Sequence, residues 1–429
     1  MRSSSAVRRP LRAAAVALAL FACAGPESDA PDAADAQPDA TIVRPVIPPD
    51  ADPCREGDRW PLSIASTTRP MLVHYQVEAD AATAAAVVAL LERAADVAID
   101  RLGLRPPLPD GGRCGPDARL DVFLWAGIDE CYVDVIDEVE ATAYDDRLAY
   151  LVLDPWGSFG GPLLPTTVAH ELTHVLQAAD DWSDLPFIYE ASAVLVEDEV
   201  WDDDDQYLAQ VADFAAHPDW SIDRDDGYQT WSMYGAAQFL RFLRDRYHRG
   251  DARFLGRLWW ALRSDADNEP DALDGVAAIL AGTGATVDDA VIEFARWRWY
   301  TGAWADGAHL EEAAAMPPPA RAGVVAARGG RQTVTPMVRG TVYLDLAVGP
   351  DDPAAVTVAL RDADPAVTWV VLALPGAGSD GDRLDLGAGP AAIDPRRVRT
   401  LAITALAPGA DADDRTDRRY AATVVIAPR

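Results

Sequence analysis

The sequence predicts an α+β protein: a small mixed sheet with a helix that carries a histidine motif, then a helical subdomain, then a C-terminal β-sandwich. Two observations carry this prediction. Between residues 57 and 182, short apolar runs bounded by Gly, Asp and Pro alternate with helical patterns. Helical patterns then dominate at 183–315, whereas 318–429 has only short β-rich runs separated by turn residues. The 429 residues are enough for domains with separate cores.

Residues 1–22 are typical of a bacterial export signal. Four arginines precede an apolar run at 13–22, and Leu20-Phe21-Ala22-Cys23 resembles a lipobox, where the signal is cut and the cysteine is lipidated. This run is too short for a permanent membrane span, which needs roughly 20 apolar residues. We therefore expect an exported protein of the cell envelope, lipid-anchored at Cys23. An ordinary cleaved signal would instead make it a secreted protein.

Residues 23–56 are rich in Ala, Asp and Pro and have almost no aromatic residues. Such a composition cannot bury enough apolar surface to offset the loss of chain entropy. We expect a disordered acidic tether between the anchor and the folded part.

The folded part is expected to begin with a mixture of strands and helices. Strands are predicted at 71–77, 120–125 and 148–153, and helices at 81–102 and 165–179. Further helices are predicted at 186–200 and 233–247. The strands predicted for the C-terminal region are 341–348, 355–360, 367–374, 401–406 and 420–426.

The composition is strongly acidic. The chain has 69 Asp and Glu against 37 Lys and Arg, a formal net charge of -32 at pH 7. Nucleic acids and anionic membrane surfaces would be repelled by this charge. We therefore expect no nucleic-acid partner, and membrane contact only through the lipid anchor.

Three cysteines remain once Cys23 is set aside as the lipidation site. They are Cys54, Cys114 and Cys131, so at most one disulfide can form among them. Export permits such a bond. The sequence allows Cys114 to pair with Cys131, or Cys54 with either.

A metal-binding motif stands in the helix predicted at 165–179. In His170-Glu171-Leu172-Thr173-His174 the histidines are four residues apart, so both imidazoles lie on one face of a helix and can reach one ion. Glu171 stands where its carboxylate can act as general base on a water activated by zinc. The spacing predicts one zinc ion held by His170 and His174.

A catalytic zinc site takes a third protein ligand, for which Glu190 is the best candidate. It is an isolated acid among apolar residues early in a predicted helix, where burial is costly unless the charge is satisfied. Glu197, seven residues on and on the same helix face, could orient a ligand histidine through its second ring nitrogen. Loop acids offer an alternative third ligand: Asp180, Asp181 or Asp184.

The acidic runs at 197–199 and 202–205 raise the alternative of a calcium ion, since carboxylate clusters suit that ion. A solvated loop explains the same runs. No regular calcium-binding loop is present in the sequence.

The motif and its surroundings resemble the gluzincins, the thermolysin-like zinc metallopeptidases, and among them exported proteins of the peptidase-MA-like kind. The residues that carry the resemblance are 168–174, then Tyr189-Glu190-Ala191-Ser192-Ala193, then Tyr234-Gly235-Ala236-Ala237. The resemblance covers roughly 70–300 and implies a zincin-like catalytic domain. It implies His170, His174 and Glu190 as ligands and Glu171 as base. Only 15 residues separate His174 from Glu190, which is fewer than the family usually has, and Ala191 stands where glycine is common.

The resemblance also bears on substrate binding. Tyr234 resembles the tyrosine that faces the oxyanion in aminopeptidase-type members, with Tyr228 and His248 as rivals for this role. In this fold the substrate backbone pairs with an edge strand before the metal helix. The segment 148–153 is the candidate, although its apolar character on both faces also suits a buried central strand.

We therefore expect a zinc metallopeptidase that acts on peptide or protein substrates. One alternative is a surface lipoprotein with a binding or adhesion role on the same scaffold. Another is a zinc hydrolase of non-peptide amides or esters, which the motif also allows.

Overall fold

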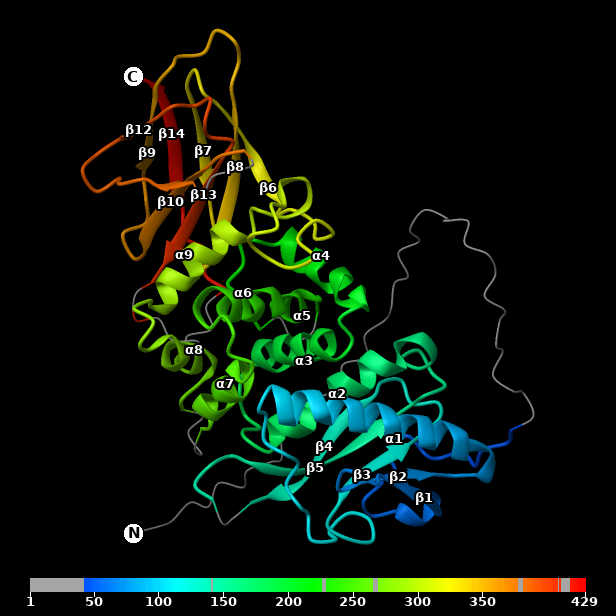
Figure 1. The fold of residues 1–429 in the computed structure, drawn as a ribbon. Helices are drawn as coiled ribbons and strands as arrows, with labels where there is room; N and C mark the ends of the chain where they lie inside the picture. Colours follow the sequence, from blue (N-terminus) through cyan, green and yellow to red (C-terminus); the bar gives the residue numbers. More distant parts are fainter. Residues whose placement is uncertain are drawn as a thin grey trace, which may run out of the picture.

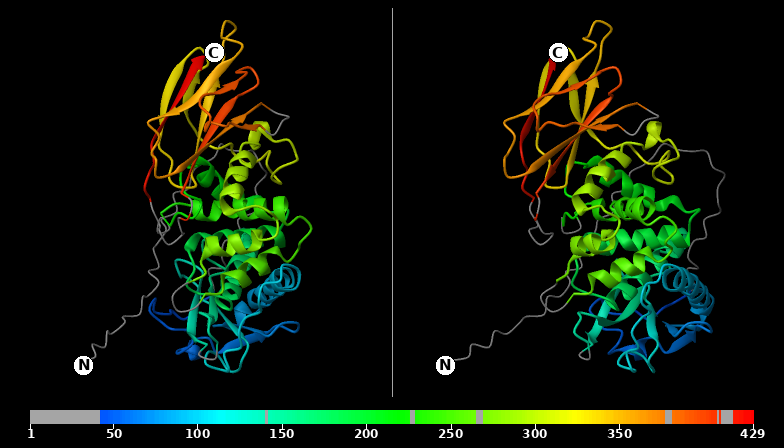
Figure 2. Two further views of the ribbon diagram at one scale, coloured as in Figure 1. Left: turned by 90° about the vertical axis from the view of Figure 1, so that its left-hand side faces the viewer. Right: turned by 60° about the vertical axis from the view of Figure 1, so that its left-hand side comes forward.

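The computed structural model describes residues 42–139, 142–225, 229–264, 269–376, 381–407, 409 and 417–429. It has the mixed α+β character that the sequence predicts. A sheet with two helices, a cluster of helices and a pair of sheets follow one another along the molecule (Figures 1 and 2). The expected signal at 1–22, Cys23 and the tether up to residue 41 lie outside the described residues.

The first sheet has five strands in the order β1-β2-β3-β5-β4. Their bounds are β1 (Leu62–Ala65), β2 (Met71–Tyr75), β3 (Leu120–Leu124), β4 (Tyr132–Glu138) and β5 (Arg147–Leu153). Strands β2, β3 and β5 run parallel, while β1 and β4 are antiparallel to their neighbours at the two edges. The three strands predicted in this region are confirmed, but β5 lies between β3 and β4. The expectation of an edge strand at 148–153 is therefore wrong, and the edge beside β5 is β4.

Both faces of this sheet are covered. On one face lie α1 (Ala81–Ala95), continued by a π-helical turn η3 (Asp96–Arg101), and α2 (Leu164–Ala178) (Figure 1). On the other face Trp60 packs edge-on against Phe123 and Trp125 and donates its indole N–H to the carbonyl of Leu124. Burial on both faces explains why β2 and β3 contain buried residues only, and why His74 of β2 pairs with Asp121 of β3 at 2.6 Å.

Residues 42–56, which we expected to belong to the tether, pack against this second face. Ile47 is buried in its core, and Arg44 forms two hydrogen bonds with buried Asp80 and lies over the ring of Trp156. A disulfide joins Cys54 to Cys114. The ordered part of the chain therefore begins before residue 57, held by a few anchoring side chains.

Loss of this disulfide is expected to destabilise the first domain. The bridge closes a loop with a sequence separation of 60, and in the chain-entropy model such a loop contributes about 4 kcal/mol. Cys54→Ser with Cys114→Ser should therefore lower the urea midpoint of unfolding, measured by circular dichroism. Cys131→Ser is the control, since Cys131 is the free thiol in the described part of the chain. Equal midpoints for the double variant and the wild type would contradict the prediction.

The middle of the molecule is helical, with α3 at its centre. The helices are α3 (Pro186–Val200), α4 (Leu208–Ala216), α5 (Ser232–Gly235), α6 (Ala237–Tyr247), α7 (Phe254–Leu262), α8 (Ala272–Leu280) and α9 (Val287–Trp297). The helix predicted at 186–200 is confirmed with the same bounds, while 233–247 is divided into α5 and α6. Short 3-10 turns also occur in the chain: η1 (Gly57–Arg59), η2 (Glu78–Asp80), η4 (Gly161–Leu163), η5 (Asp205–Tyr207) and η6 (Gly302–Trp304).

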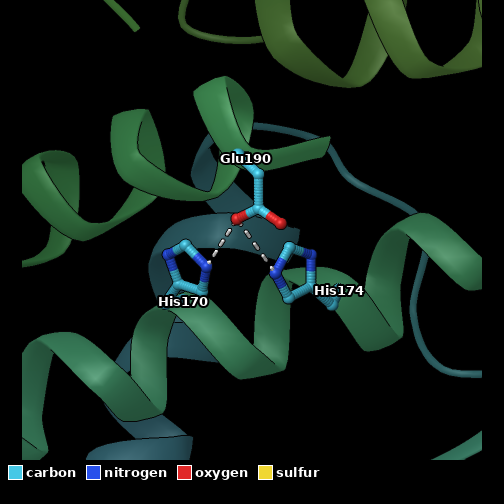
Figure 3. A group of neighbouring side chains, drawn as sticks. All are labelled: His170, His174 and Glu190. Atoms are coloured by element: carbon cyan, nitrogen blue, oxygen red, sulfur yellow. Dashed lines mark hydrogen bonds and ion pairs between the residues drawn. The ribbon is translucent and has the colours of Figure 1, made fainter. Parts of the chain in front are cut away.

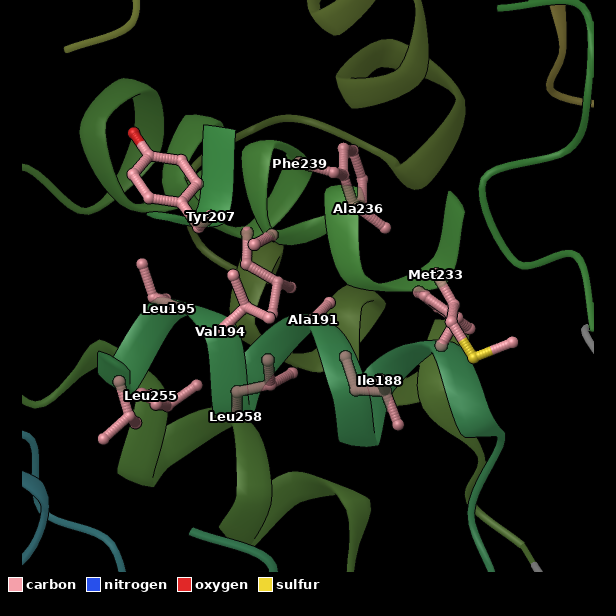
Figure 4. Packing of buried hydrophobic residues seen from close by; sticks show 14 of the residues in the cluster. Ile188, Ala191, Val194, Leu195, Tyr207, Met233, Ala236, Phe239, Leu255 and Leu258 are labelled. Carbon is pink, nitrogen blue, oxygen red and sulfur yellow. The ribbon is translucent and has the colours of Figure 1, made fainter. Parts of the chain in front are cut away.

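Helix α3 is buried on nearly all sides, since 12 of its 15 residues are buried. Its apolar side chains pack between α5 and α6 on one side and α7 on the other (Figure 4). A helix that is covered all round cannot leave its charged residues in water. The acids Glu190, Glu197 and Asp198 must therefore find partners inside the protein.

The C-terminal region contains two sheets, ordered β11-β10-β13-β8-β6 and β12-β9-β14-β7. Apolar side chains from both sheets form one hydrophobic core. Helix α9 packs on β10 and β13, and Tyr343 donates a hydrogen bond to the carbonyl of Ala295 in this helix. The bounds are β6 (Arg321–Ala326), β7 (Gly330–Val334), β8 (Thr341–Ala347), β9 (Val356–Arg361), β10 (Thr368–Leu374), β11 (Asp382–Arg383), β12 (Ala391–Ile393), β13 (Thr400–Leu406) and β14 (Ala422–Pro428).

Among the described residues, no helix combines the length and the apolar character that a bilayer crossing requires.

Candidate metal centre

Helix α2 carries the histidine motif at the boundary between the sheet and the helical region. Its buried face, with Val168, Leu172 and Val175, packs into the main core and holds the helix in place. His170 and His174 project from the other side, one turn apart, with ring centroids separated by 4.7 Å. Their side chains are 12% and 15% exposed, so the two imidazoles are mostly covered by the protein and keep only a small exposed part.

Glu190 on α3 lies directly opposite these rings. Its Oε2 atom is 3.1 Å from Nε2 of His170 and 3.7 Å from Nε2 of His174 (Figure 3). The turn at 179–185 is long enough to bring the start of α3 back over α2, so the short connection to Glu190 is no obstacle. The three residues predicted as ligands therefore come together.

The geometry of these three residues fits a zinc ion. Their ligand atoms all lie within 4.8 Å of one another. Donors at zinc bond lengths in a tetrahedral site are about 3.3 Å apart, close to the distances from Glu190 to the two rings. Two histidines and one glutamate also form a donor set typical of catalytic zinc. Across the described ranges, this is the one group of three or more His, Cys, Asp or Glu residues with such proximity.

The loop acids offered as alternatives to Glu190 have other partners. Asp181 accepts hydrogen bonds from the backbone N–H and the hydroxyl of Ser264. Asp180 lies 3.7 Å from the guanidinium of Arg263, and Asp184 accepts from the next backbone N–H. None of them belongs to the metal-binding group among the described residues.

Each histidine is held by a hydrogen bond at its other ring nitrogen. Nδ1 of His170 donates to Oε1 of Glu197 at 2.5 Å, as the sequence predicted for Glu197. Nδ1 of His174 donates to Oε1 of Gln177 at 2.7 Å, a contact that the sequence analysis missed. The sequence could have indicated this contact, because Gln177 lies three residues after His174 and therefore on the same helix face. Both Nε2 atoms are thereby left facing Glu190.

The electrostatics of the site are those of a buried cluster of opposite charges. Burial opposes the ionisation of Glu190, but His174, His170 and a hydrogen bond from Tyr234 outweigh it and lower its pKa. Burial also opposes the charge on His170, yet its bonds to Glu190 and Glu197 hold its pKa well above the ordinary value. The pKa of His174 is lowered by burial.

Glu171 stands apart from the three converging donor atoms. Burial raises its pKa to about 7, with the carboxylates of Glu190 and Glu197 acting in the same direction and His170 opposing them. A carboxylate with a pKa near neutrality is suited to accept and return a proton.

Tyr234 lies beside the site, as predicted. Its ring stacks on His170 with the centroids 6.0 Å apart. The ring of Trp231 packs against Tyr234 with the centroids 5.1 Å apart. The rival His248 lies elsewhere, against Phe254 and Arg257. The other rival, Tyr228, lies outside the described residues.

The acids of the first acidic run, 197–199, pair with a histidine and with arginines. Glu197 bonds His170, Asp198 pairs with Arg241, and Glu199 pairs with Arg244 and Arg101. Gln206 donates to Asp204 in the second run. These acids form no metal-binding group within the described part of the chain, so the calcium alternative gains no support.

Comparison with protein-family models and with characterised proteins finds no match. The resemblance to gluzincins therefore stays an expectation that rests on the motif residues. A function has to be inferred from the site itself, because a general fold class is compatible with many functions.

Proposed function

We propose that this protein is a zinc-dependent metallopeptidase of the gluzincin type that hydrolyses peptide bonds in peptide or protein substrates. The observation that carries the proposal is the convergence of His170, His174 and Glu190, with Glu171 next to His170 in the same motif. The intact base favours an enzyme over a binding protein, because a site that only binds a partner has no need of Glu171.

The residues of the chain divide the chemistry between them. Zinc, when bound to His170, His174 and Glu190, supplies Lewis-acid polarisation of the substrate carbonyl. Glu171 takes a proton from the attacking water and returns it to the amide nitrogen as the C–N bond breaks. We assign to Tyr234, whose ring stacks on His170, the donation of a hydrogen bond to the oxygen that becomes negatively charged, in exchange for its hydrogen bond to Glu190.

Strand β4 is the element that we propose to bind the substrate backbone. In the described part of the chain it pairs with β5 alone, so its other edge is available to an extended peptide. Strand β4 packs against α2, the helix that carries Glu171. A peptide added to β4 would therefore run along the sheet edge close to this helix.

The proposal also covers the domain architecture of the protein and its location in the cell. We assign 57–182 and 183–315 to the two parts of a zincin-like catalytic domain and 318–429 to a β-sandwich, whose two sheets share one core. Export, lipidation at Cys23 and a tether would place this catalytic domain in the cell envelope of a bacterium.

Metal removal tests the proposed function. Dialysis of the purified chain against a chelator should abolish cleavage of a mixed peptide library, and one equivalent of zinc should restore it. Metal content by mass spectrometry and cleavage by peptide mapping are the measurements. Cleavage that survives complete metal removal would refute the zinc mechanism. Bound zinc without any peptide cleavage would favour a binding role or a non-peptide substrate.

A further inference from the structure

We propose that Gln177 is a positioning residue that places the proton of His174 on Nδ1 and so keeps Nε2 free to bind the metal. The inference rests on the proposed zinc site but concerns a residue outside the ligand set. It follows from a chain of hydrogen bonds that runs from His174 through Gln177 and Ser192 to Trp259.

The amide of Gln177 can adopt only one orientation. One end of the amide is 3.0 Å from the carbonyl oxygen of Tyr189 and 2.9 Å from the hydroxyl of Ser192. A backbone carbonyl only accepts hydrogen bonds, so the amide nitrogen must be at this end. The amide oxygen then faces His174, and because this oxygen can only accept, Nδ1 of His174 must carry the proton.

Ser192 is equally constrained. Its hydroxyl donates to the carbonyl of Ile188 at 2.6 Å, with the carbonyl of Tyr189 as a longer acceptor at 3.2 Å. It accepts from Gln177 and from the indole N–H of Trp259, which is 3.1 Å away. One donor and two acceptor positions are all that a hydroxyl has, so none is left over. Gln177, Ser192 and Trp259 are each fully buried, and water cannot substitute for a lost partner.

The two ligand histidines are therefore oriented by different chemistry. His170 donates to the carboxyl group of Glu197, a group that can carry a negative charge or take up a proton. His174 donates to a neutral amide, which adds no negative charge to a site that already holds Glu171, Glu190 and Glu197. The amide orients the ring without changing the charge of the site, and its anchors come from α3 and α7 rather than from α2.

Proton-detected NMR of the histidine rings tests the inference directly. The chain has only 6 His, so the ring signals of the full chain labelled with nitrogen-15 can be assigned, with His174→Gln identifying the signal of interest. We expect His174 of the metal-free wild type to be protonated at Nδ1. A signal from protonated Nε2, or a mixture of both forms, would overturn the inference without any variant at Gln177.

Two substitutions separate positioning from simple packing. Gln177→Met keeps the length but removes the acceptor, and we expect a mixture of ring forms and about 10- to 100-fold weaker zinc binding in competition with a chromophoric chelator. Gln177→Glu keeps an acceptor for Nδ1 and should bind zinc more tightly than Gln177→Met. If Gln177 served only for packing, Gln177→Met would bind zinc more tightly than Gln177→Glu, because burying a charge destabilises the fold more than burying a methionine. The control Gln238→Met changes a buried glutamine whose hydrogen-bond partner is Met316 rather than a histidine of the site.

The outcomes distinguish this inference from the proposed function. A wild-type chain that binds no zinc would refute the proposed function, while the ring signal of His174 would still decide the role of Gln177. Zinc binding by Gln177→Met at wild-type strength, or the order predicted by packing, would overturn the inference and leave the zinc site standing.

Discussion

Glu171→Gln is expected to lower peptide hydrolysis by about a hundred- to ten-thousand-fold, the contribution typical of a positioned general base. The amide has the shape of the carboxylate but cannot take the proton from the attacking water. Glu171 does not belong to the group of His170, His174 and Glu190, whose atoms converge. Zinc content should therefore stay at the wild-type level while turnover falls.

The measurement is the turnover rate at saturating peptide, with metal content determined on the same sample. Glu293→Gln is a suitable control, since Glu293 lies on α9 and pairs with Arg296 far along the chain from the motif. The control should retain full activity. Wild-type turnover in Glu171→Gln would show that another group acts as the base and would remove the mechanism proposed for this site.

Arg241→Met is expected to lower the free energy of unfolding by about 3–5 kcal/mol, because it leaves buried carboxylates without their cation. Arg241 on α6 is 3% exposed and pairs with Asp198 of α3, which is 5% exposed. It also contacts Glu312 at 2.7 Å and Glu311 at 3.4 Å. The guanidinium therefore joins α3, next to the residue that orients His170, to the segment leading to the C-terminal sheets.

Thermal and urea unfolding followed by circular dichroism measure this effect. The matched control is Arg257→Met, whose side chain is 51% exposed and pairs with Asp251. A pair of this kind contributes about 0–1 kcal/mol, so the control should unfold close to the wild type. If both variants lost a similar free energy of unfolding, the buried ion pairs of Arg241 would contribute no more to stability than an exposed pair.

The segments that the sequence predicted best have a strong local pattern. Helix α3 has the predicted bounds, since most of its residues from Phe187 to Val196 are apolar and Pro186 stands at its first turn. Strand β4 was missed because Asp134, Asp137 and Glu138 interrupt its apolar residues, and acids are depleted in strands. An edge strand tolerates such residues, but whether a strand lies at an edge depends on its neighbours.

The prediction that 42–56 is disordered was wrong for a similar reason. Composition averages over many residues, and 42–56 is polar and rich in proline on average. A few side chains nevertheless anchor it: Ile47 in the core, Arg44 on Asp80 and Trp156, and Cys54 in the disulfide. These contacts join residues far apart in the chain, which a local pattern does not reveal.

The sequence by itself determined the part of the site that is local. His170 and His174 share a helix face because four residues make about one helical turn, and Glu171 lies between them. The tertiary structure alone decided how the site is completed. Glu190 and Glu197 reach the rings from α3, which crosses α2, and the amide of Gln177 is oriented by Tyr189, Ser192 and Trp259. These groups meet through the packing of helices, and the directions of their hydrogen bonds exist only once the helices are packed.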